Sequence, residues 1–515
     1  MTSLQVTPAT ATVAVGLEQA FTAMAGLSDG GVRDVTGDAA LSWSSSDVRV
    51  ATVDSVGVAT GVSPGEVTVS AVLGELKGTA SLTVTPLGHV VTWGCRSCGG
   101  DSSAVQDQLS NVQAITANST AFAALKSDGT VVTWGDPNAG GDSSAVQSQL
   151  THVQSITGDH MFGVYGREGE VFGGAFAALK QDGTVVTWGN SSNGGDSSAV
   201  QGQLTEVQAI FAGYHAYAAL KRDGTVVTWG DPSTGGDSSA VQAQLTHVRT
   251  IVSSFGAFSA LKQDGTVVTW GESRHGGDSS AVQAQLTDVQ TVVSDAVAFA
   301  ALKQDGTVVA WGYCLSSQIT GCNGDDPLLL AQLTHVQSIV GSVGAFAALK
   351  QDGTVVTWGD TGQGGDSSAV QAKLTQVTSI FRAWEAFAAV KQDGTVVTWG
   401  NGYYGGDSSA VQAQLTGVNT IASTEAAFAA LKQDGSVVSW GDKDWGGNSS
   451  AVQNQLTDVK SIAGSLKAFA ALTRNGSVVT WGDCFAGGCS LAVQSQLVGV
   501  QSITANISAF AAIVR

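Results

Sequence analysis

The alternation of apolar and polar residues divides the chain into two parts. Residues 1–86 contain short alternating runs, such as 11–15 and 67–72, separated by clusters of Gly, Ser and Asp. This pattern is typical of a small antiparallel β-sandwich. Residues 87–515 instead repeat one pattern many times. We therefore predict an all-β chain of two domains, 1–86 and 87–515.

The repeating part is marked by a Trp-Gly pair at the end of Val-Val-Thr-Trp-Gly or a close variant. Seven of the nine spacings between these pairs are 41 residues, and the other two, 54 and 47, indicate insertions of 13 and 6 residues. A period of this length predicts a propeller, a solenoid or an array. The tryptophans are Trp93, Trp134, Trp188, Trp229, Trp270, Trp311, Trp358, Trp399, Trp440 and Trp481.

One copy of the repeat predicts a small meander. Residues 248–252 alternate as a strand, 258–262 form a second strand, Asp264-Gly265 is a favoured hairpin turn, and 267–270 form a third strand. The segment that begins at Gly277-Asp278-Ser279-Ser280 is a fourth element. Its pattern fits either a strand or a short helix capped by Asp278.

The two ends of the repeating part complement each other. The first copy has the strand 90–93 without a preceding Phe-Ala-Ala-Leu strand, and the last copy has 510–513 without a following Val-Val-Thr-Trp-Gly. If the ends share a blade, no strand edge is left unpaired. We predict a closed β-propeller of about ten blades, although ten exceeds the usual four to eight. An open spiral with two half-copies is the alternative.

The N-terminal part resembles the group 2 bacterial Ig-like domain. The resemblance lies in Trp43-Ser44-Ser45, the Ala-Thr-Val run at 51–53, and the glycine-containing runs at 57–61 and 65–69. It implies a spacer or stalk of the kind found in bacterial surface proteins and adhesins. Trp43 is expected in the core.

The repeats resemble the regulator of chromosome condensation family in their Asp-Gly…Trp-Gly order. Gly236-Asp237-Ser238-Ser239 replaces that family's Gly-Gln-Leu-Gly loop. The resemblance implies a β-propeller used for protein–protein recognition. One class in the family exchanges nucleotide on a small GTPase, and a bacterial class inhibits β-lactamases through propeller loops. Neither activity is carried over to this chain. Nucleotide exchange in that family uses a protruding β-wedge, and no segment of this sequence can be assigned to one.

Two short windows vary between copies while the framework hardly changes. One window follows Trp-Gly and the other precedes Phe-Ala-Ala-Leu, and strand direction places both on one face, opposite the Gln-Asp-Gly turns. Both insertions, within 160–174 and 313–330, fall in these windows. We expect the aromatic and charged residues of these loops, Trp445 among them, to be exposed to solvent. Such residues on loops held by a rigid scaffold are typical of recognition surfaces, whereas unconstrained drift would leave mostly small polar residues. The predicted binding residues are Tyr165, Tyr214, His215, Phe255, Arg274, His275, Arg382, Trp384, Glu385, Tyr403, Tyr404, Lys443 and Trp445.

All six cysteines lie in windows that follow Trp-Gly, as the pairs Cys95/Cys98, Cys314/Cys322 and Cys484/Cys489. Pairing within each loop predicts three disulfides and an oxidising compartment. Two alternatives involve the Cys95 and Cys484 loops, which a closed ring makes neighbours. Their four thiolates could bind zinc, or they could pair across the loops.

The other titratable residues predict framework roles. His152, His247 and His335 share one repeat position with Asn111, Glu206, Asp288 and Gln376, which indicates a solvated site and not a ligand set. The recurring aspartates are expected to form caps or turns, and they are Asp142, Asp196, Asp237, Asp278, Asp366 and Asp407. No catalytic set, metal site or cofactor motif is recognised.

The composition limits which partners and which cellular location we expect. With 42 acidic and 23 basic residues the formal charge is -19, which makes nucleic acid an unfavourable partner. No run is long enough to span a membrane, and the start has no signal pattern, so an export signal is expected outside this sequence, in a longer natural protein. We predict a non-enzymatic module, extracellular or on the cell surface. It would be a monomer or part of a longer surface protein, and it would bind a protein or glycan through the variable loops. One alternative is a secreted enzyme inhibitor that uses the same loops. A third hypothesis is an enzyme with its site in the central channel of the ring, which would need carboxylates or histidines that converge at the channel mouth.

Overall fold

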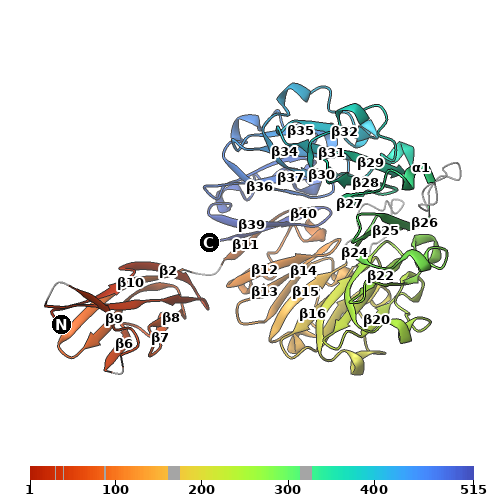
Figure 1. Ribbon diagram of the computed structural model, residues 1–515. Helices are drawn as coiled ribbons and strands as arrows, with labels where there is room; N and C mark the ends of the chain where they lie inside the picture. Colours follow the sequence, from red (N-terminus) through yellow and green to blue (C-terminus); the bar gives the residue numbers. More distant parts are fainter. Residues whose placement is uncertain (29–30, 39, 86–87, 160–173, 314–326) are drawn as a thin grey trace.

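The computed structural model describes residues 1–515 except 29–30, 39, 86–87, 160–173 and 314–326, and its architecture is all-β (Figure 1). Strands β1–β10 pair only with one another in the described residues. They form the sheets β1-β4-β5, β2-β10-β9-β6 and β3-β8-β7. Their bounds are β1 (Ser3–Thr7), β2 (Thr10–Ala14), β3 (Glu18–Ala20), β4 (Thr22–Gly26), β5 (Val32–Asp34), β6 (Leu41–Ser45), β7 (Ala51–Val53), β8 (Val58–Gly61), β9 (Gly65–Leu73) and β10 (Leu76–Thr85).

These sheets enclose one apolar core, in which Phe21, Val69 and Leu82 are buried. Trp43 packs against this core while remaining half-buried. Its indole lies so close to Gly57 that a Cβ there would come within 2.8 Å of the ring, and Gly57 also has a φ of +83°. Trp43 and Gly57, two of the residues that carry the resemblance, therefore pack on each other.

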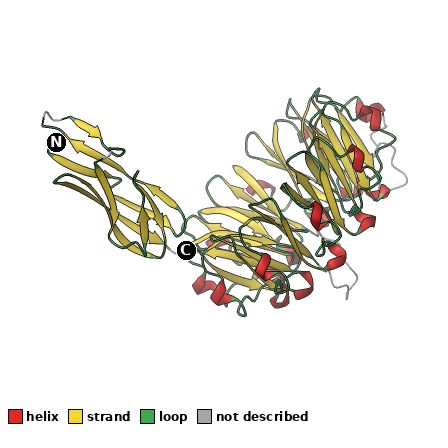
Figure 2. Ribbon diagram, turned by 90° about the horizontal axis from the view of Figure 1, so that it is seen from below, coloured by secondary structure: helices red, strands yellow, loops and turns green. Residues whose placement is uncertain are grey.

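The repeating part forms three-stranded antiparallel sheets, called blades here, joined by connections with short helical turns (Figure 2). Blades 1–9 follow chain order, and blade 10 combines β39 and β40 with β11. The bounds of blades 1–5 are β12 (Val112–Ala117), β13 (Ala121–Lys126), β14 (Val131–Gly135), β15 (Val153–Gly158), β16 (Ala175–Lys180), β17 (Val185–Gly189), β18 (Val207–Ala212), β19 (Ala216–Lys221), β20 (Val226–Gly230), β21 (Val248–Ser253), β22 (Ala257–Lys262), β23 (Val267–Gly271), β24 (Val289–Ser294), β25 (Ala298–Lys303) and β26 (Val308–Gly312). Those of α1 and blades 6–10 are α1 (Pro327–Leu330), β27 (Val336–Gly341), β28 (Ala345–Lys350), β29 (Val355–Gly359), β30 (Val377–Arg382), β31 (Ala386–Lys391), β32 (Val396–Gly400), β33 (Val418–Ser423), β34 (Ala427–Lys432), β35 (Val437–Gly441), β36 (Val459–Gly464), β37 (Ala468–Thr473), β38 (Val478–Gly482), β39 (Val500–Ala505), β40 (Ala509–Val514) and β11 (His89–Gly94).

Each blade is buried on both faces, because neighbouring blades cover it. In one core, Ala175, Ala177 and Leu179 of blade 2 meet Tyr217 and Trp229 of blade 3. Double burial explains why Phe-Ala-Ala-Leu does not alternate apolar with polar residues. Within each blade the Phe or Tyr of the second strand stacks on the Trp of the third, with ring centroids 5.2–5.5 Å apart.

The tryptophans also join each blade to the blade before it. The indole Nε1 of Trp229 donates to the carbonyl oxygen of Gly194 at 2.9 Å, across the boundary between blades 3 and 2. The described residues contain nine such bonds, at 2.9–3.0 Å. The repeated Trp-Gly pair is therefore a contact between blades as well as part of a blade.

The two ends of the repeating part meet in blade 10. β11 pairs with β40 over six residues, from His89 opposite Val514 to Gly94 opposite Ala509, and the two lie side by side in Figure 1. Blade 10 packs on blade 1 with the same type of core as other neighbours, and Trp93 donates to Gly487 of blade 9 at 3.0 Å. The predicted sharing of one blade by both ends is thus present.

The fourth element of the repeat is not a strand. Asp278 Oδ1 accepts the N–H of Ser280, and a short 3₁₀ turn, Gln283–Gln285, follows. Ser279 Oγ lies 2.9 Å from Thr269 Oγ1 and donates to Gln283 Oε1, while Gln283 Nε2 donates to the Val267 carbonyl. The Asp-Ser-Ser-Ala-Val-Gln segment is therefore held along the third strand by side-chain hydrogen bonds.

The histidine position of the repeat is exposed and has a backbone requirement that the sequence did not reveal. His152, His247 and His335 have φ of 54–56°, in the left-handed region. The same conformation occurs at the equivalent position of every other blade, including Gly417 at 63°. The recurring aspartates, in contrast, behave as predicted, since each Oδ1 accepts the N–H two residues on.

Candidate binding site on the loop face

Two sets of loops make up one face of the blades. The hairpin loops are the three-residue connections between the first and second strands, 118–120, 213–215, 254–256, 295–297, 342–344, 383–385, 424–426, 465–467 and 506–508. The exit loops follow the third strands and begin with short helical turns such as Lys443–Trp445. These sets correspond to the two variable windows.

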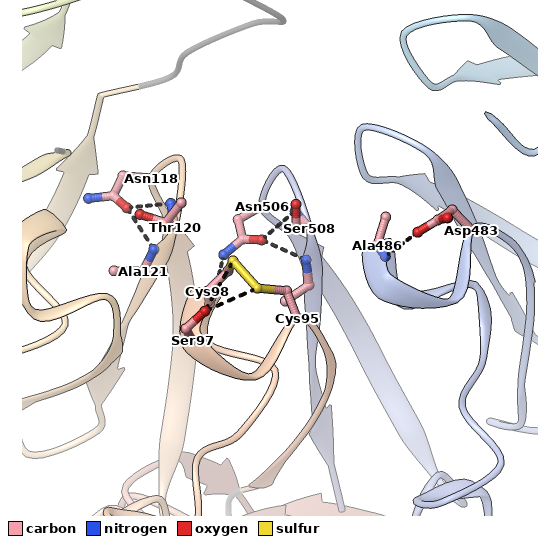
Figure 3. The surroundings of a disulfide bond; sticks show 11 residues. Cys95, Ser97, Cys98, Asn118, Thr120, Ala121, Asp483, Ala486, Asn506 and Ser508 are labelled. Carbon is pink, nitrogen blue, oxygen red and sulfur yellow. Dashed lines mark hydrogen bonds between the residues drawn. A yellow bond between two sulfur atoms is a disulfide. The ribbon is translucent and has the colours of Figure 1, made fainter. Parts of the chain in front are cut away.

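Side-chain hydrogen bonds hold the two loop sets together. Thr424 Oγ1 donates to the Trp445 carbonyl at 2.8 Å, and Ser465 Oγ donates to the Ala486 carbonyl at 2.8 Å. Asn506 Nδ2 donates to the carbonyl of Cys98 at 2.6 Å (Figure 3). The first residue of the hairpin loop thus anchors the exit loop of the same blade, so both windows lie on one face, as strand direction predicted.

Backbone hydrogen bonds link successive hairpin loops through their middle residues. The N–H of Val343 donates to Trp384, Trp384 to Glu425, Glu425 to Leu466, Leu466 to Ile507, and Ile507 to Ser119, at 3.0–3.3 Å. The last of these bonds joins loops from opposite ends of the repeating part. Because the backbone is tied down, these loops form a preorganised surface.

Two pockets open among the hairpin loops. The Glu425 pocket, of about 340 Å³, is lined by loops of blades 1 and 7–10, including Trp384, Glu425, Leu466 and Ile507. The Asp295 pocket, of about 270 Å³, is lined by loops of blades 3–7, including Tyr214, Phe255 and Asp295. Arg382 and Trp384 line both pockets and form the wall between them.

Aromatic side chains from distant blades meet at this wall. The rings of Tyr214 and Phe255 are 5.8 Å apart, and those of Phe255 and Trp384 are 6.4 Å apart. Tyr214 also packs on His215, whose pKa is lowered by burial. Blades 3, 4 and 7 therefore contribute to one aromatic cluster, although more than 160 residues of sequence separate Tyr214 from Trp384.

The charged groups of the pockets are strongly desolvated. Burial raises the pKa of Asp295 well above its usual range, although its Oδ1 accepts the N–H groups of Val297 and Ala298. Burial lowers the pKa of Arg382, and the Asp295 carboxylate opposes that shift. Burial likewise raises the pKa of Glu425 to about 7, which Lys467 opposes and Glu385 reinforces.

Five of the predicted binding residues belong to hairpin loops, and Arg382 ends the strand before one. They are Tyr214, His215, Phe255, Trp384 and Glu385, and all are half-buried. Their roles in binding stay predictions. Sequence reasoning missed Asp295 and Glu425, each a single acidic residue in a variable window, and only the convergence of several loops buries them.

The exit-loop residues are more dispersed. Arg274 is exposed, and His275 Nδ1 lies 2.7 Å from Glu272 Oε2. Tyr403 is half exposed, with its ring edge-on to that of the half-buried Tyr404. Lys443 is exposed and pairs with Asp444 at 2.8 Å.

The expectation that Trp445 is exposed is wrong. Only 7% of its surface is accessible, and Lys467 Nζ lies 4.3 Å from the centre of its ring. Trp445 is the last residue of its helical turn, and its carbonyl accepts a hydrogen bond from the Thr424 hydroxyl. This bond holds the turn against the hairpin loop of the same blade. Tyr165 lies outside the described residues.

The described cysteines form disulfides within their own loops. Cys95 is bonded to Cys98 (Figure 3), and Cys484 is bonded to Cys489. The four sulfurs of these neighbouring loops are therefore neither zinc ligands nor cross-paired. Cys314 and Cys322 lie outside the described residues. The sequence prediction of local disulfides therefore holds for both loops that the structure describes.

Comparison with known proteins identifies the N-terminal part. Residues 1–84 match the bacterial Ig-like domain (group 2), and these residues are such a domain. Ice-binding protein 1 of Shewanella frigidimarina is 46% identical over 90 residues. That match covers 16% of this chain and 10% of that protein, so the chain spans about a tenth of its curated relative.

Solved structures similar to the chain include propellers of the regulator of chromosome condensation type. Prp20p from Saccharomyces cerevisiae, described with its binding to Gsp1p and histones, has a TM-score of 0.34 and 15% identity over 62% of this chain and 84% of its own. Human WBSCR16 has a TM-score of 0.31 and 16% identity over 60% and 86%. The ectodomain of the Arabidopsis thaliana receptor kinase ACR4 has a TM-score of 0.30 and 16% identity over 54% and 97%. At these TM-scores the similarities add nothing to the strand pairing described above.

Among the residues that the structure describes, no helix is long and apolar enough to cross a membrane.

Proposed function

We propose that this chain is an exported or cell-surface binding module whose ligand site is the loop face, centred on the Glu425 and Asp295 pockets. In this proposal the blades close into a ring of ten. The Ig-like domain, residues 1–86, serves as the stalk, and the propeller, 87–515, recognises a protein or a glycan. The proposed role is binding and not catalysis.

The observation that carries this proposal is the wall shared by the two pockets. Trp384 is half-buried and contacts an aromatic ring from a non-adjacent blade, while Arg382 beside it is desolvated. Aromatic and arginine side chains in preorganised pockets are the residues that most often dominate binding energy. If this face bound no ligand, we would not expect aromatic and arginine side chains from several blades to meet at one wall.

Local disulfides support the proposed location. The Cys95–Cys98 and Cys484–Cys489 bonds pin two exit loops, and such bonds persist in oxidising compartments. The group 2 Ig-like domain supports the same location, because the resemblance implies a stalk of bacterial surface proteins.

A screen of glycan and surface-protein arrays tests the proposal. We expect Trp384→Ala to weaken binding of any ligand found at least tenfold. Val498→Ala is the matched control, because Val498 is 64% exposed and precedes β39 at the opposite, turn-bearing end of the blade. Equal binding by both variants would overturn the assignment of the site to the loop face. If the chain binds a single enzyme on the arrays and also inhibits that enzyme, the chain is an inhibitor.

A further inference from the structure

Glu425 differs from the other charged groups around its pocket. Only 7% of its surface is accessible, and its Oε2 accepts no hydrogen bond within the described part of the chain. Glu385, the nearby carboxylate, accepts Gln363 Nε2 at 3.4 Å and Asn401 Nδ2 at 2.7 Å. Of these two neighbouring carboxylates, Glu425 is therefore the one with a buried oxygen that no hydrogen bond satisfies.

The cations near this pocket already have other partners. Lys467 Nζ lies over the ring of Trp445, at 4.3 Å from its centre. Arg382 interacts with the buried Asp295 on the other side of the wall. Lys467 opposes the rise in the pKa of Glu425 but does not cancel it, because the pKa remains near 7. A desolvated carboxylate without a bonded cation is costly, and a ligand can remove that cost.

We propose that the Glu425 pocket accepts a cationic side chain, a lysine or arginine of a protein partner, which pairs with the Glu425 carboxylate beside the indole of Trp384. This inference rests on the proposed function and names the chemistry of its ligand. The pocket, of about 340 Å³, also offers the apolar side chains of Leu466 and Ile507 to the methylene groups of such a residue. A cation near an indole gains further from the negative face of the ring.

The overall charge favours a basic protein over a neutral glycan. At a formal charge of -19 the chain attracts basic partners over long distances. A sugar hydroxyl could donate a hydrogen bond to Glu425, but it would leave the buried negative charge in place. A lysine or arginine compensates both the hydrogen bond and the charge.

The proposed pairing has a definite pH dependence. The groups that act on Glu425 are Lys467, which lowers its pKa, and Glu385, which raises it. Because only the ionised carboxylate pairs with a cation, binding should be strong above the pKa of about 7 and should weaken as the pH falls through it. Lysine and arginine stay charged throughout this range.

Fluorescence anisotropy with fluorescein-labelled hexalysine tests this inference on the full chain in roughly physiological salt, which screens non-specific attraction. Hexalysine with the same label, acetylated on every Nε, is the probe of the same length without charged side chains. Glu425→Gln removes the charge with little change in shape. Glu206→Gln is the matched control, because Glu206 is exposed and lies before β18 at the opposite end of its blade.

We expect Glu425→Gln to weaken hexalysine binding at least tenfold and to abolish its pH dependence, while Glu206→Gln changes affinity less than twofold. Equal affinity of wild type and Glu425→Gln would overturn the inference. So would equal binding of the acetylated peptide to the wild type, a comparison that holds even if the variant folds poorly. A ligand from the array screen could lose affinity on Trp384→Ala and yet not be displaced by excess hexalysine. That result would support the loop face as the binding site and would refute a cationic ligand in the Glu425 pocket.

Discussion

The indole hydrogen bonds between blades allow a direct test of whether the ring closes. Trp93→Phe removes the bond from Nε1 to the Gly487 carbonyl at 3.0 Å, where the two ends of the repeating part meet. Trp229→Phe removes the corresponding bond to Gly194 at 2.9 Å, in the middle of the chain. Both indoles are buried, with 4% of their surface accessible.

The expected loss follows from the contacts removed. A buried carbonyl left without its donor costs about 1–3 kcal/mol, and the smaller ring leaves a void that costs about 1 kcal/mol more. If the roughly 430 residues of the repeating part unfold together, their unfolding entropy is about 0.9 kcal/mol/K. A total loss of about 2–4 kcal/mol should then lower Tm by about 2–4 °C.

Thermal unfolding followed by near-ultraviolet circular dichroism or calorimetry provides the measurement. In a closed ring no blade is terminal, so the two substitutions should lower Tm equally. A normal Tm for Trp93→Phe together with a lowered Tm for Trp229→Phe would refute closure, because the contact at Trp93 would then not be part of the cooperative structure. If both variants keep the wild-type Tm, the indole hydrogen bonds contribute less to stability than the calculation above requires.

Three further predictions concern stability. Glu206→Gly should raise Tm by about 1 °C, because Glu206 has a φ of 57° and glycine removes roughly 1 kcal/mol of left-handed backbone strain. Gly417 already occupies the equivalent position of another blade. An unchanged or lower Tm would contradict this reasoning. Joint replacement of Cys484 and Cys489 by serine should cost about 2 kcal/mol, as expected for a short loop closed by one disulfide, and denaturant unfolding that shows no loss would argue against it. Thr269→Val should cost about 1 kcal/mol, because it removes a buried hydroxyl contact of 2.9 Å to the following segment; a variant as stable as the wild type would show that this segment is held in other ways.

Local sequence signals were sufficient for the three strands of a blade, but they left the fourth element undecided between a strand and a short helix. Asp264-Gly265 specified the turn, and strand direction alone placed both variable windows on one face. The sharing of blade 10 followed from counting half-copies at the two ends. These features depend on neighbours in sequence or on simple connectivity, which a single chain with many copies displays clearly.

Burial within the loop face could not be predicted in the same way. Trp445 and Glu425 occupy variable, loop-like positions, and nothing in the flanking residues distinguishes them from exposed ones. Glu425 is buried because hairpin loops from several blades converge. Trp445 is buried because its exit loop packs against the hairpin loop of its own blade and Lys467 of the next blade lies over its ring. Both arrangements depend on contacts that local sequence does not display. The left-handed position was hidden for a different reason, since histidine, glutamate and asparagine there indicate only exposure.

The pairing of β11 with β40 imposes an order on folding. β11 is synthesised at the start of the repeating part, and its partner is synthesised only at the very end, more than 400 residues later. Until then β11 has an open edge, and other blades offer second strands almost identical to the correct one, so mispairing competes with completion. Assembly of the last blade is therefore the step at which a nascent chain is most exposed to misfolding, and shortening either end would leave that edge permanently available to other chains.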